Sequence, residues 1–466
     1  MGSDSLSQEQ QEIIDGTCTL ENIELPFESR REDKREKKKK NVSLSLSLSL
    51  SLSPISLSTS VSDWKPEPLL PEVTEQQKLD SRIPLIESAH GARVVLEGNK
   101  ECVNLAALNP FGLLGEPEID QAATEALQKY GCGSCGPRGF YGTIDVHLKL
   151  EKDLADFMRC EQTILYSSGF ATVASAIPTF AKKGDLIFCD RGVNQAVQTG
   201  VSLSRADVIY FAHNDMADLS KQLEAVAADP KRAKKRKFVV VEGLYANYGT
   251  VLPFDKLMPL KHKHCFYLIV DESYSLGWLG AHGGGILELF DGKPGGEDID
   301  IITGHLGNIA CSVGGFCSGN NSVVTHQRLN GSGYVFSASL PPYLSCVSSA
   351  ALKRIRTDDA RRRAMVRYAE IATELLSAKD SPFVLRSSPQ SPLIHIELRK
   401  DNTDARLQQL VENCIDRGVL LTRAKYVEAE LFRPPPSIRL CVPASLTEAE
   451  VRKAINAVVD CARKLA

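Results

Sequence analysis

Residues 266–273 read FYLIVDES and form a short apolar run that ends in acidic residues. Consecutive apolar side chains without a polar break are typical of a strand buried on both faces, as in a parallel sheet. Asp271 ends the run, and ligands of open α/β sheets bind at the carboxyl ends of the strands. A carboxylate there can pair with a protonated ring nitrogen. The same position also suits the N-cap of a following helix, so both interpretations of Asp271 stay open.

Five similar apolar runs share the central part of the chain with this stretch. They are TILYSSG at 163–169, DLIFCD at 185–190, DVIYFA at 207–212, FVVVEGLY at 238–245 and DIITG at 300–304. Helical patterns lie between them, for example MADLSKQLEAVAAD at 216–229. Alternation of buried strands with helices predicts an α/β fold, with a mainly parallel sheet between layers of helices.

The pattern changes near residue 345, where a long helical segment leads into a mixed region. That region contains SPLIHIELR at 391–399, a helical pattern at 404–418, the apolar run SIRLCV and a closing helix from Thr447. Ahead of the large region, RVVLEG and CVNLAAL are typical of a short hairpin. The predicted organisation is a leader at 1–62, an extended segment with a hairpin at 63–110, a large α/β domain at 111–344 and a smaller α+β domain at 345–466.

Composition excludes several classes of protein. The chain has 466 residues, 43% hydrophobic and 24% charged, with a formal net charge of -3. These values are ordinary for a globular protein and give no global reason for nucleic-acid binding. The 13 cysteines show no repeated metal spacing, and their odd number favours reduced thiols. No apolar run has the roughly 18 residues of a membrane-spanning helix.

The first 62 residues predict a disordered leader. The stretch RREDKREKKKK at 30–40 is a solvated block of charge. Ser/Leu alternation at 41–60 is of low complexity and lacks an evident pairing partner. A basic block followed by an apolar tract can also touch a membrane surface, so that alternative stays open.

Three short motifs resemble known functional motifs, but the rest of the sequence gives these interpretations little support. CGSC at 132–135 lacks the aromatic residue of a cysteine-protease motif and the second Cys/His pair of a zinc site. HGGG at 282–285 resembles a hydrolase oxyanion loop, but the chain has no GxSxG motif. KRAKKRK at 231–237 is expected to be a solvated loop, with attraction of coenzyme A phosphates or anionic lipid as the alternative.

The loop TGHLGNIACSVGG at 303–315 follows a predicted strand and is rich in small residues. It is built like a loop that holds a reactive group over a cofactor. Between Leu306 and Gly315, however, it contains no Lys, His, Asp or Glu, and position 308 is Asn.

The order of these segments resembles the fold-type I pyridoxal-phosphate enzymes and, among them, the α-oxoamine synthases. Within that family the chain is similar to the first, lysine-free type of serine palmitoyltransferase subunit. The resemblance extends from DWKPEPLLP to the C-terminus. Its most specific marks are GPRGFYGTIDVHL at 136–148, VGGFCSG at 313–319 and HQRLNGSGYVFSASLPP at 326–342.

The resemblance implies a degenerate active site in this chain. Asn308 stands where catalytic members carry the lysine that binds the cofactor covalently. Asn194 and Tyr274 stand where the family has two histidines, and Asp271 keeps the pyridine-nitrogen position. An amide neither forms an imine nor acts as a base near neutral pH. We therefore expect no catalytic residue in this chain and the pyridoxal phosphate of the complex on a partner subunit.

The resemblance also implies that this chain borders the active site of its partner. Ser337 and Ser339 are the candidates for contact with the partner's cofactor phosphate, and helix capping is their alternative role. The small-residue loop supplies the other expected interface residues, which are Cys135, Gly136, Pro137, Arg138, Gly139 and Tyr141. The loop can also be a plain connection.

The implied partner is the second, lysine-bearing type of serine palmitoyltransferase subunit, and the substrates of the heterodimer are L-serine and palmitoyl-CoA. The implied location is the cytosolic face of the endoplasmic reticulum membrane, with membrane contact through partners. Two alternatives stay open. One is a self-sufficient homodimer that uses another lysine, and the other is a scaffold or regulatory pseudoenzyme.

Overall fold

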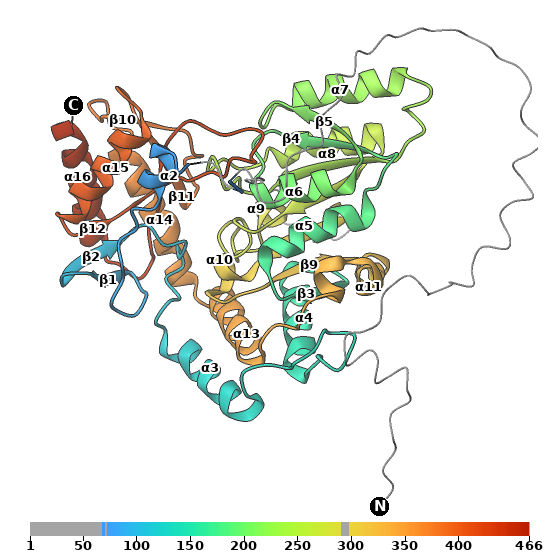
Figure 1. Cartoon of the computed structure of the whole chain (residues 1–466), viewed down its shortest axis with the longest axis horizontal. Helices are drawn as coiled ribbons and strands as arrows, with labels where there is room; N and C mark the ends of the chain where they lie inside the picture. The colour runs from blue at the N-terminus through green and yellow to red at the C-terminus, as the bar shows by residue number, and fades with distance from the viewer. Residues whose placement is uncertain (1–67, 70–71, 290–297, 466) are drawn as a thin grey trace, which may run out of the picture. The chain divides into compact units, whose positions relative to one another are not determined.

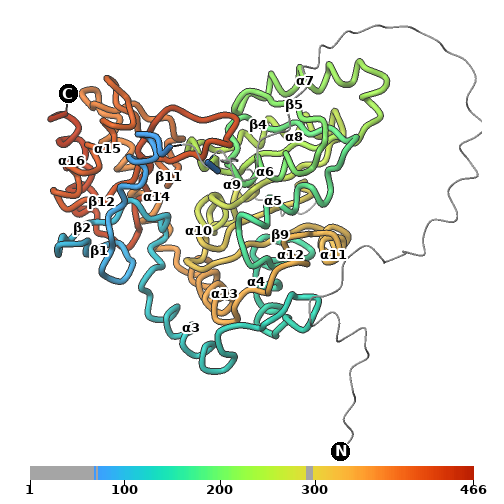
Figure 2. Tube along the Cα trace, in the orientation of Figure 1, coloured from blue at the N-terminus to red at the C-terminus, as the bar shows by residue number. Residues whose placement is uncertain are grey.

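The computed structural model describes residues 68–69, 72–289 and 298–465. The predicted leader at 1–62 therefore lies outside the described residues. Figure 1 shows the arrangement of the described elements, and Figure 2 traces the path of the chain through them. None of the described helices is long and apolar enough to cross a membrane.

The large sheet has seven strands, in the order β3-β9-β8-β7-β6-β4-β5. Their bounds are Gln162–Tyr166 for β3, Gly315–Gly319 for β9, Ile301–His305 for β8, Tyr267–Asp271 for β7, Lys237–Glu242 for β6, Leu186–Asp190 for β4 and Asp207–Phe211 for β5. All pairings from β8 to β5 are parallel, whereas β9 pairs antiparallel with both neighbours. The α/β prediction and all six predicted strands are confirmed.

Helices alternate with these strands and continue to the C-terminus. Those of the first half are α2 (Glu75–Asp80), α3 (Pro117–Tyr130), α4 (Asp145–Met158), α5 (Gly169–Phe180), α6 (Gln195–Ser204), α7 (Met216–Ala228) and α8 (Phe254–His264). Those of the second half are α9 (Ile286–Leu289), α10 (Leu306–Ala310), α11 (Asn321–Asn330), α12 (Ser332–Val335), α13 (Pro342–Thr357), α14 (Asp359–Leu376), α15 (Asp404–Ile415) and α16 (Glu448–Leu465).

Two smaller sheets accompany the large one. The predicted hairpin is present as β1 (Arg93–Leu96) and β2 (Lys100–Asn104), and β12 (Val419–Leu420) pairs parallel with β2. The second sheet is antiparallel and has the order β10-β11-β14-β13. Its strands are Phe383–Leu385, Leu393–Leu398, Ile438–Cys441 and Thr422–Arg423, in that order.

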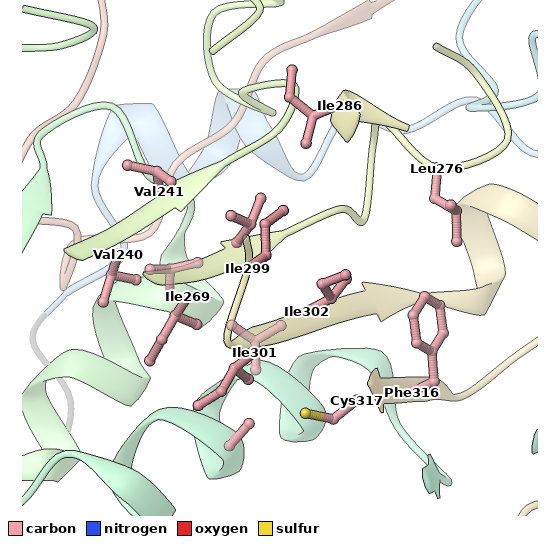
Figure 3. Close-up of a cluster of buried hydrophobic side chains, with 14 of the residues drawn as sticks. Val240, Val241, Ile269, Leu276, Ile286, Ile299, Ile301, Ile302, Phe316 and Cys317 are labelled. Carbon is pink, nitrogen blue, oxygen red and sulfur yellow. The ribbon is translucent and has the colours of Figure 1, made fainter. Parts of the chain in front are cut away.

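The large core forms because apolar side chains on both faces of the central strands are covered. Every residue of β4 is buried, as a strand between two helical layers requires. Figure 3 shows part of this core, which includes Val240 of β6, Ile269 of β7, Ile302 of β8 and Phe316 of β9. The rigid sheet fixes the ends of its strands, and the site residues follow those ends.

A second core belongs to the C-terminal sheet and helices α15 and α16. Helix α13 contributes to the large core, and α14 contributes Met365 to the large core and Ile371 to the second core. The chain therefore passes from one core to the other within α14. The predicted domain boundaries, including the start of the small domain near 345, stay a prediction.

Candidate functional site

A cavity of about 300 Å³ lies at the carboxyl ends of β6, β7 and β8. Its walls come from the starts of α5 and α6, from the segments after these strands and from a C-terminal segment. The lining residues are Gly169, Phe170, Val173, Asn194, Gln195, Ala196, Ala246, Asn247, Asp271, Ser273, Tyr274, His305, Asn308, Lys425, Glu430 and Arg439. The cavity thus brings together the four positions predicted for a degenerate active site, which are Asn194, Asp271, Tyr274 and Asn308.

Asp271 is buried at the end of β7, and its carboxylate accepts four hydrogen bonds. Oδ1 accepts from the Ser273 N–H at 3.2 Å, the Ser273 hydroxyl at 2.6 Å and the Thr303 hydroxyl at 3.3 Å. Oδ2 accepts from Asn194 Nδ2 at 3.1 Å. Burial raises the pKa of Asp271, and the bonds from Ser273 and Asn194 oppose that rise.

Asn194 connects this carboxylate to helix α6. Its side-chain Oδ1 accepts from the N–H groups of Ala196 at 2.8 Å and Val197 at 3.3 Å, so it is the N-cap of α6. Its Nδ2 faces Asp271, and its backbone N–H donates to the buried carboxylate of Glu242. Burial, followed by the charge of Asp271, raises the pKa of Glu242. Asn194 therefore supplies donors to both buried acids.

Asn308 and Tyr274 also line the cavity. Asn308 is in α10, directly after β8, and its Nδ2 donates to the Ser273 carbonyl at 3.2 Å. The Tyr274 ring meets Trp278 edge-on, with 5.8 Å between the ring centroids. Burial raises the pKa of the Tyr274 hydroxyl. Neither side chain offers a nucleophile or a base at neutral pH.

His305 lines the cavity as well, although the sequence analysis did not identify it. Its Nδ1 accepts from the Gly307 N–H at 2.8 Å, and burial lowers its pKa. A Cβ at Gly169 would lie 2.2 Å from the imidazole Cδ2, so only glycine leaves room for this ring. The signal in the sequence is its position directly after the apolar run DIITG, at the carboxyl end of a predicted strand.

Two cations reach the cavity from the C-terminal part of the chain. Lys425 is the one lysine among the described lining residues, and its Nζ donates to the Asp80 carbonyl at 2.6 Å. The Nε of Arg439 is buried and has no hydrogen-bond partner among the described residues. Both lie far from β7 and β8 in sequence, so no local pattern could place them in the site.

The predicted interface loop forms a compact structure with the serine segment. The Gly136 carbonyl accepts from the Ser339 N–H at 2.9 Å, and the Pro137 carbonyl accepts from the N–H of Gly142 at 2.9 Å. Arg138 is buried, and its guanidinium donates to both oxygens of Glu151, at 2.9 and 3.1 Å. Arg138 thus anchors the loop to α4 of its own chain.

The outer part of this loop is exposed. Cys135 has a φ of 54° and Tyr141 a φ of 66°, an uncommon conformation for residues with side chains. Tyr141 is fully exposed, and Gly139 has no neighbour within 4 Å of an added Cβ.

The two predicted serines differ in burial. Ser339 is buried and donates its hydroxyl to the Gly142 carbonyl at 2.6 Å. Ser337 is half-buried, donates to the Gly333 carbonyl at 2.6 Å and accepts from the Ser167 hydroxyl at 3.2 Å. Ser337 is therefore the more accessible of the two.

The residues of this cavity do not fit a covalently held pyridoxal phosphate. Position 308 offers an amide, and the amine of Lys425 is exposed and bonded to Asp80. The carboxylate of Asp271, which would face the ring nitrogen, already accepts four hydrogen bonds. Among its described lining residues, the cavity therefore offers no unpaired amine for covalent attachment of the cofactor.

Comparisons with known proteins agree with this geometry. The model of the family "Aminotransferase class I and II" matches residues 100–458. The chain is 44% identical over 413 residues to serine palmitoyltransferase 1 of Dictyostelium discoideum, with 86% of each chain covered. It is 40% identical over 412 residues to long chain base biosynthesis protein 1 of Arabidopsis thaliana, with 86% of this chain and 84% of that protein covered. A solved serine palmitoyltransferase with its pyridoxal phosphate as internal aldimine matches with a TM-score of 0.75 and 25% identity, over 84% of this chain and 96% of that one.

Proposed function

Since this chain belongs to the class I and II aminotransferase family, and within it to the serine palmitoyltransferase 1 family, we propose that it is the non-catalytic subunit of a serine palmitoyltransferase heterodimer. The complex of this family is an acyltransferase, and its cofactor is pyridoxal phosphate. In the proposed complex, a second subunit holds the cofactor on a lysine. The complex condenses L-serine with palmitoyl-CoA, releases CO2 and coenzyme A, and yields 3-ketosphinganine at the cytosolic face of the endoplasmic reticulum.

The single observation that carries this proposal is the amide of Asn308 in α10, directly after β8. In the family the residue at this position supplies the amine, but here Nδ2 donates to the Ser273 carbonyl. Asn194 binds Asp271 in the same cavity, so the carboxylate is satisfied without a cofactor ring. The chain therefore keeps the fold of the family and leaves the covalent step to its partner.

The surface proposed to meet the partner is formed by the loop at 131–143 and the segment at 336–339. Phe140, Tyr141 and Phe336 expose 66%, 103% and 86% of their surface there. Exposed aromatic side chains grouped around a rigid loop are typical of a protein–protein interface. Hydrogen bonds between the two segments fix the loop, which lets it border a neighbouring active site with little loss of conformational entropy.

Co-expression with a lysine-bearing serine palmitoyltransferase subunit tests this function. Each chain alone and the pair together would be assayed for condensation of L-serine with palmitoyl-CoA. We expect activity only for the pair. Turnover by this chain alone would show that it is a self-sufficient enzyme. Full activity of the partner alone would show that this chain acts only as a scaffold.

The variant Ser337→Ala tests whether this chain contacts the partner's cofactor or only supports the partner's structure. If its hydroxyl contacts the partner's cofactor phosphate, the pair should still copurify but bind pyridoxal phosphate about tenfold to a hundredfold more weakly, as for one lost hydrogen bond to a charged group. Ser332→Ala is the control, because that exposed hydroxyl lies outside the segment at 336–339. Equal cofactor affinity in both variants would contradict the assignment of Ser337.

A further inference from the structure

The amino-terminal edge of the large sheet gathers cationic loops. Strands β4, β5, β6 and β7 begin side by side, because Leu186 pairs with Asp207 and Lys237, and Phe238 pairs with Tyr267. The turns that enter these strands therefore end at one edge. We call the following cations of these turns the basic edge: Lys182, Lys183, Lys231, Arg232, Lys234 and Lys237.

The carboxylates at this edge are largely neutralised by other cations. The ion pairs are Lys235–Asp207 at 2.5 Å, Arg236–Asp185 at 2.6 Å, Lys261–Asp300 at 2.6 Å and Lys263–Glu224 at 2.8 Å. Among the residues that the structure describes, no side-chain nitrogen of the basic edge forms an ion pair with a carboxylate within 4.0 Å. Asp229, the nearest acid in sequence, accepts from the backbone N–H groups of Lys231 and Arg232. The edge is thus positive in a chain whose formal net charge is -3.

The basic edge lies at the opposite end of the strands from the cavity. Parallel strands place their amino ends at one edge and their carboxyl ends, with Asp271, at the other. Five residues at about 3.3 Å each separate the two edges by roughly 17 Å. The cations therefore do not serve the cavity of this chain, which excludes attraction of a substrate's phosphates into it as their role.

One aromatic side chain stands among these cations. Tyr267 begins β7 and exposes 48% of its surface. Its ring stacks on Phe238, with centroids 5.3 Å apart, and Arg236 lies over the Phe238 ring at 5.5 Å. One face of Tyr267 is therefore covered, so the ring offers a poor stacking platform for nucleic-acid bases. A tyrosine among lysines is typical of residues at a membrane interface.

From this combination we infer that the basic edge binds an anionic lipid surface. Lysine ammonium groups act as mobile point charges that neutralise clustered headgroups without demanding a fixed geometry. The attractions of several basic residues to an anionic bilayer add up, so six of them give useful but reversible binding. The inference is independent of the proposed heterodimer, because all the residues of the basic edge belong to this chain.

Vesicle cosedimentation of the full-length chain, with any copurifying partner left bound, tests the inference. The vesicles would contain phosphatidylcholine alone or with about one fifth phosphatidylserine, at low and at physiological salt. We expect binding only to the phosphatidylserine vesicles, and weaker binding at the higher salt. The double variant Lys231→Glu/Lys234→Glu should weaken it by at least about tenfold.

The matched control is Lys400→Glu/Lys464→Glu, which makes the same charge change at exposed positions of the C-terminal part. Its vesicle binding should equal that of the unmodified chain. If the first variant does not fold, Lys182→Gln/Lys183→Gln provides the same test at two exposed residues. Equal binding by the unmodified chain and a folded basic-edge variant would overturn the inference, as would equal binding to both vesicles. Tighter binding to a single-stranded oligonucleotide than to the anionic vesicles at the same salt would also overturn it.

Discussion

At the scale of single residues, the amides of two asparagines make polar contacts that hold the cavity together. Asn194 caps α6 and binds Asp271, and Asn308 binds the carbonyl of Ser273. Each amide donates a hydrogen bond to a buried acceptor, the Asp271 carboxylate or the Ser273 carbonyl. Both contacts therefore add to the stability of the cavity.

Restoring the lysine alone should not restore activity. In Asn308→Lys the new amine would enter a cavity whose Asp271 still accepts from Asn194 and whose wall still carries Tyr274. We expect the isolated variant to show no condensation of L-serine with palmitoyl-CoA above background. The measurement is a product assay by mass spectrometry, and steady turnover by the isolated variant would refute the prediction.

The contact between Asn194 and Asp271 should contribute measurably to stability. Asn194→Ala removes both the cap of α6 and a donor to a buried carboxylate, so its free energy of unfolding should fall by about 2–4 kcal/mol. Asn320→Ala is the matched control, because Asn320 caps α11 through the Val323 N–H alone and should cost about 1 kcal/mol. Denaturant unfolding compares the two, and equal losses would mean that the Asp271 contact contributes nothing.

At the scale of elements, most strands of the large sheet can be recognised from short apolar runs in the sequence. The six parallel strands could be predicted because each is a nearly continuous buried run between helices. Strand β9 was missed because GFCSG has two glycines in five residues and resembles a loop, although all five are buried. Its strand conformation comes from pairing with β3 and β8, which is a tertiary cause.

The residues of the site also fall into those that could be predicted from the sequence and those that depend on tertiary packing. Asn194, Asp271, Tyr274 and Asn308 could be predicted to lie together because of the family resemblance, whereas the strand pattern alone placed only Asp271 at a ligand-binding edge. Lys425 and Arg439 could not be predicted, because they enter from segments whose place depends on the second core. The resemblance and the strand pattern therefore identify one side of the cavity, and the other side depends on long-range packing.

The loop that holds the proposed interface should depend on one glycine. A Cβ at Gly142 would lie 2.0 Å from the Gly136 carbonyl oxygen, so Gly142→Ala must displace the loop backbone. We expect the variant to lose most of the activity of the co-expressed pair. Gly139→Ala is the control, because nothing lies within 4 Å of its Cβ and it should keep that activity. Equal activity of the two variants would contradict this role of the loop.

Strand β11 gives the fold a dependence on pH. Burial lowers the pKa of His395 to about 4, and its ring nitrogens bond the Ser437 hydroxyl and the Ala246 carbonyl, each at 3.0 Å. Between about pH 6.5 and pH 4 the unfolded chain binds a proton that the folded chain does not. Stability should therefore fall by on the order of 3 kcal/mol as pH drops through that window.

The variant His395→Gln tests this linkage, because glutamine can still donate to the Ala246 carbonyl but does not titrate. Its free energy of unfolding should change less between pH 7 and pH 4 than that of the unmodified chain. His90→Gln, at an exposed side chain, is the control and should leave the slope unchanged. Parallel pH profiles for all three proteins would show that His395 does not cause the acid sensitivity.

At the scale of the whole molecule, the chain presents three separate surfaces with different tasks. The residues of the cavity at the carboxyl ends of the strands do not fit a covalently held cofactor. The loop at 131–143, with its exposed aromatic side chains, is proposed to contact a partner subunit. The basic edge is inferred to bind anionic lipid. The central claim is that the complex performs its chemistry on the other subunit. That claim concerns where the cofactor is attached.

Borohydride reduction of the copurified pair with pyridoxal phosphate, followed by peptide mass spectrometry, tests this claim most directly. We predict a pyridoxyl modification on a lysine of the partner subunit and none on peptides of this chain, including those containing Lys425. A stoichiometric modification on any peptide of this chain would contradict the account.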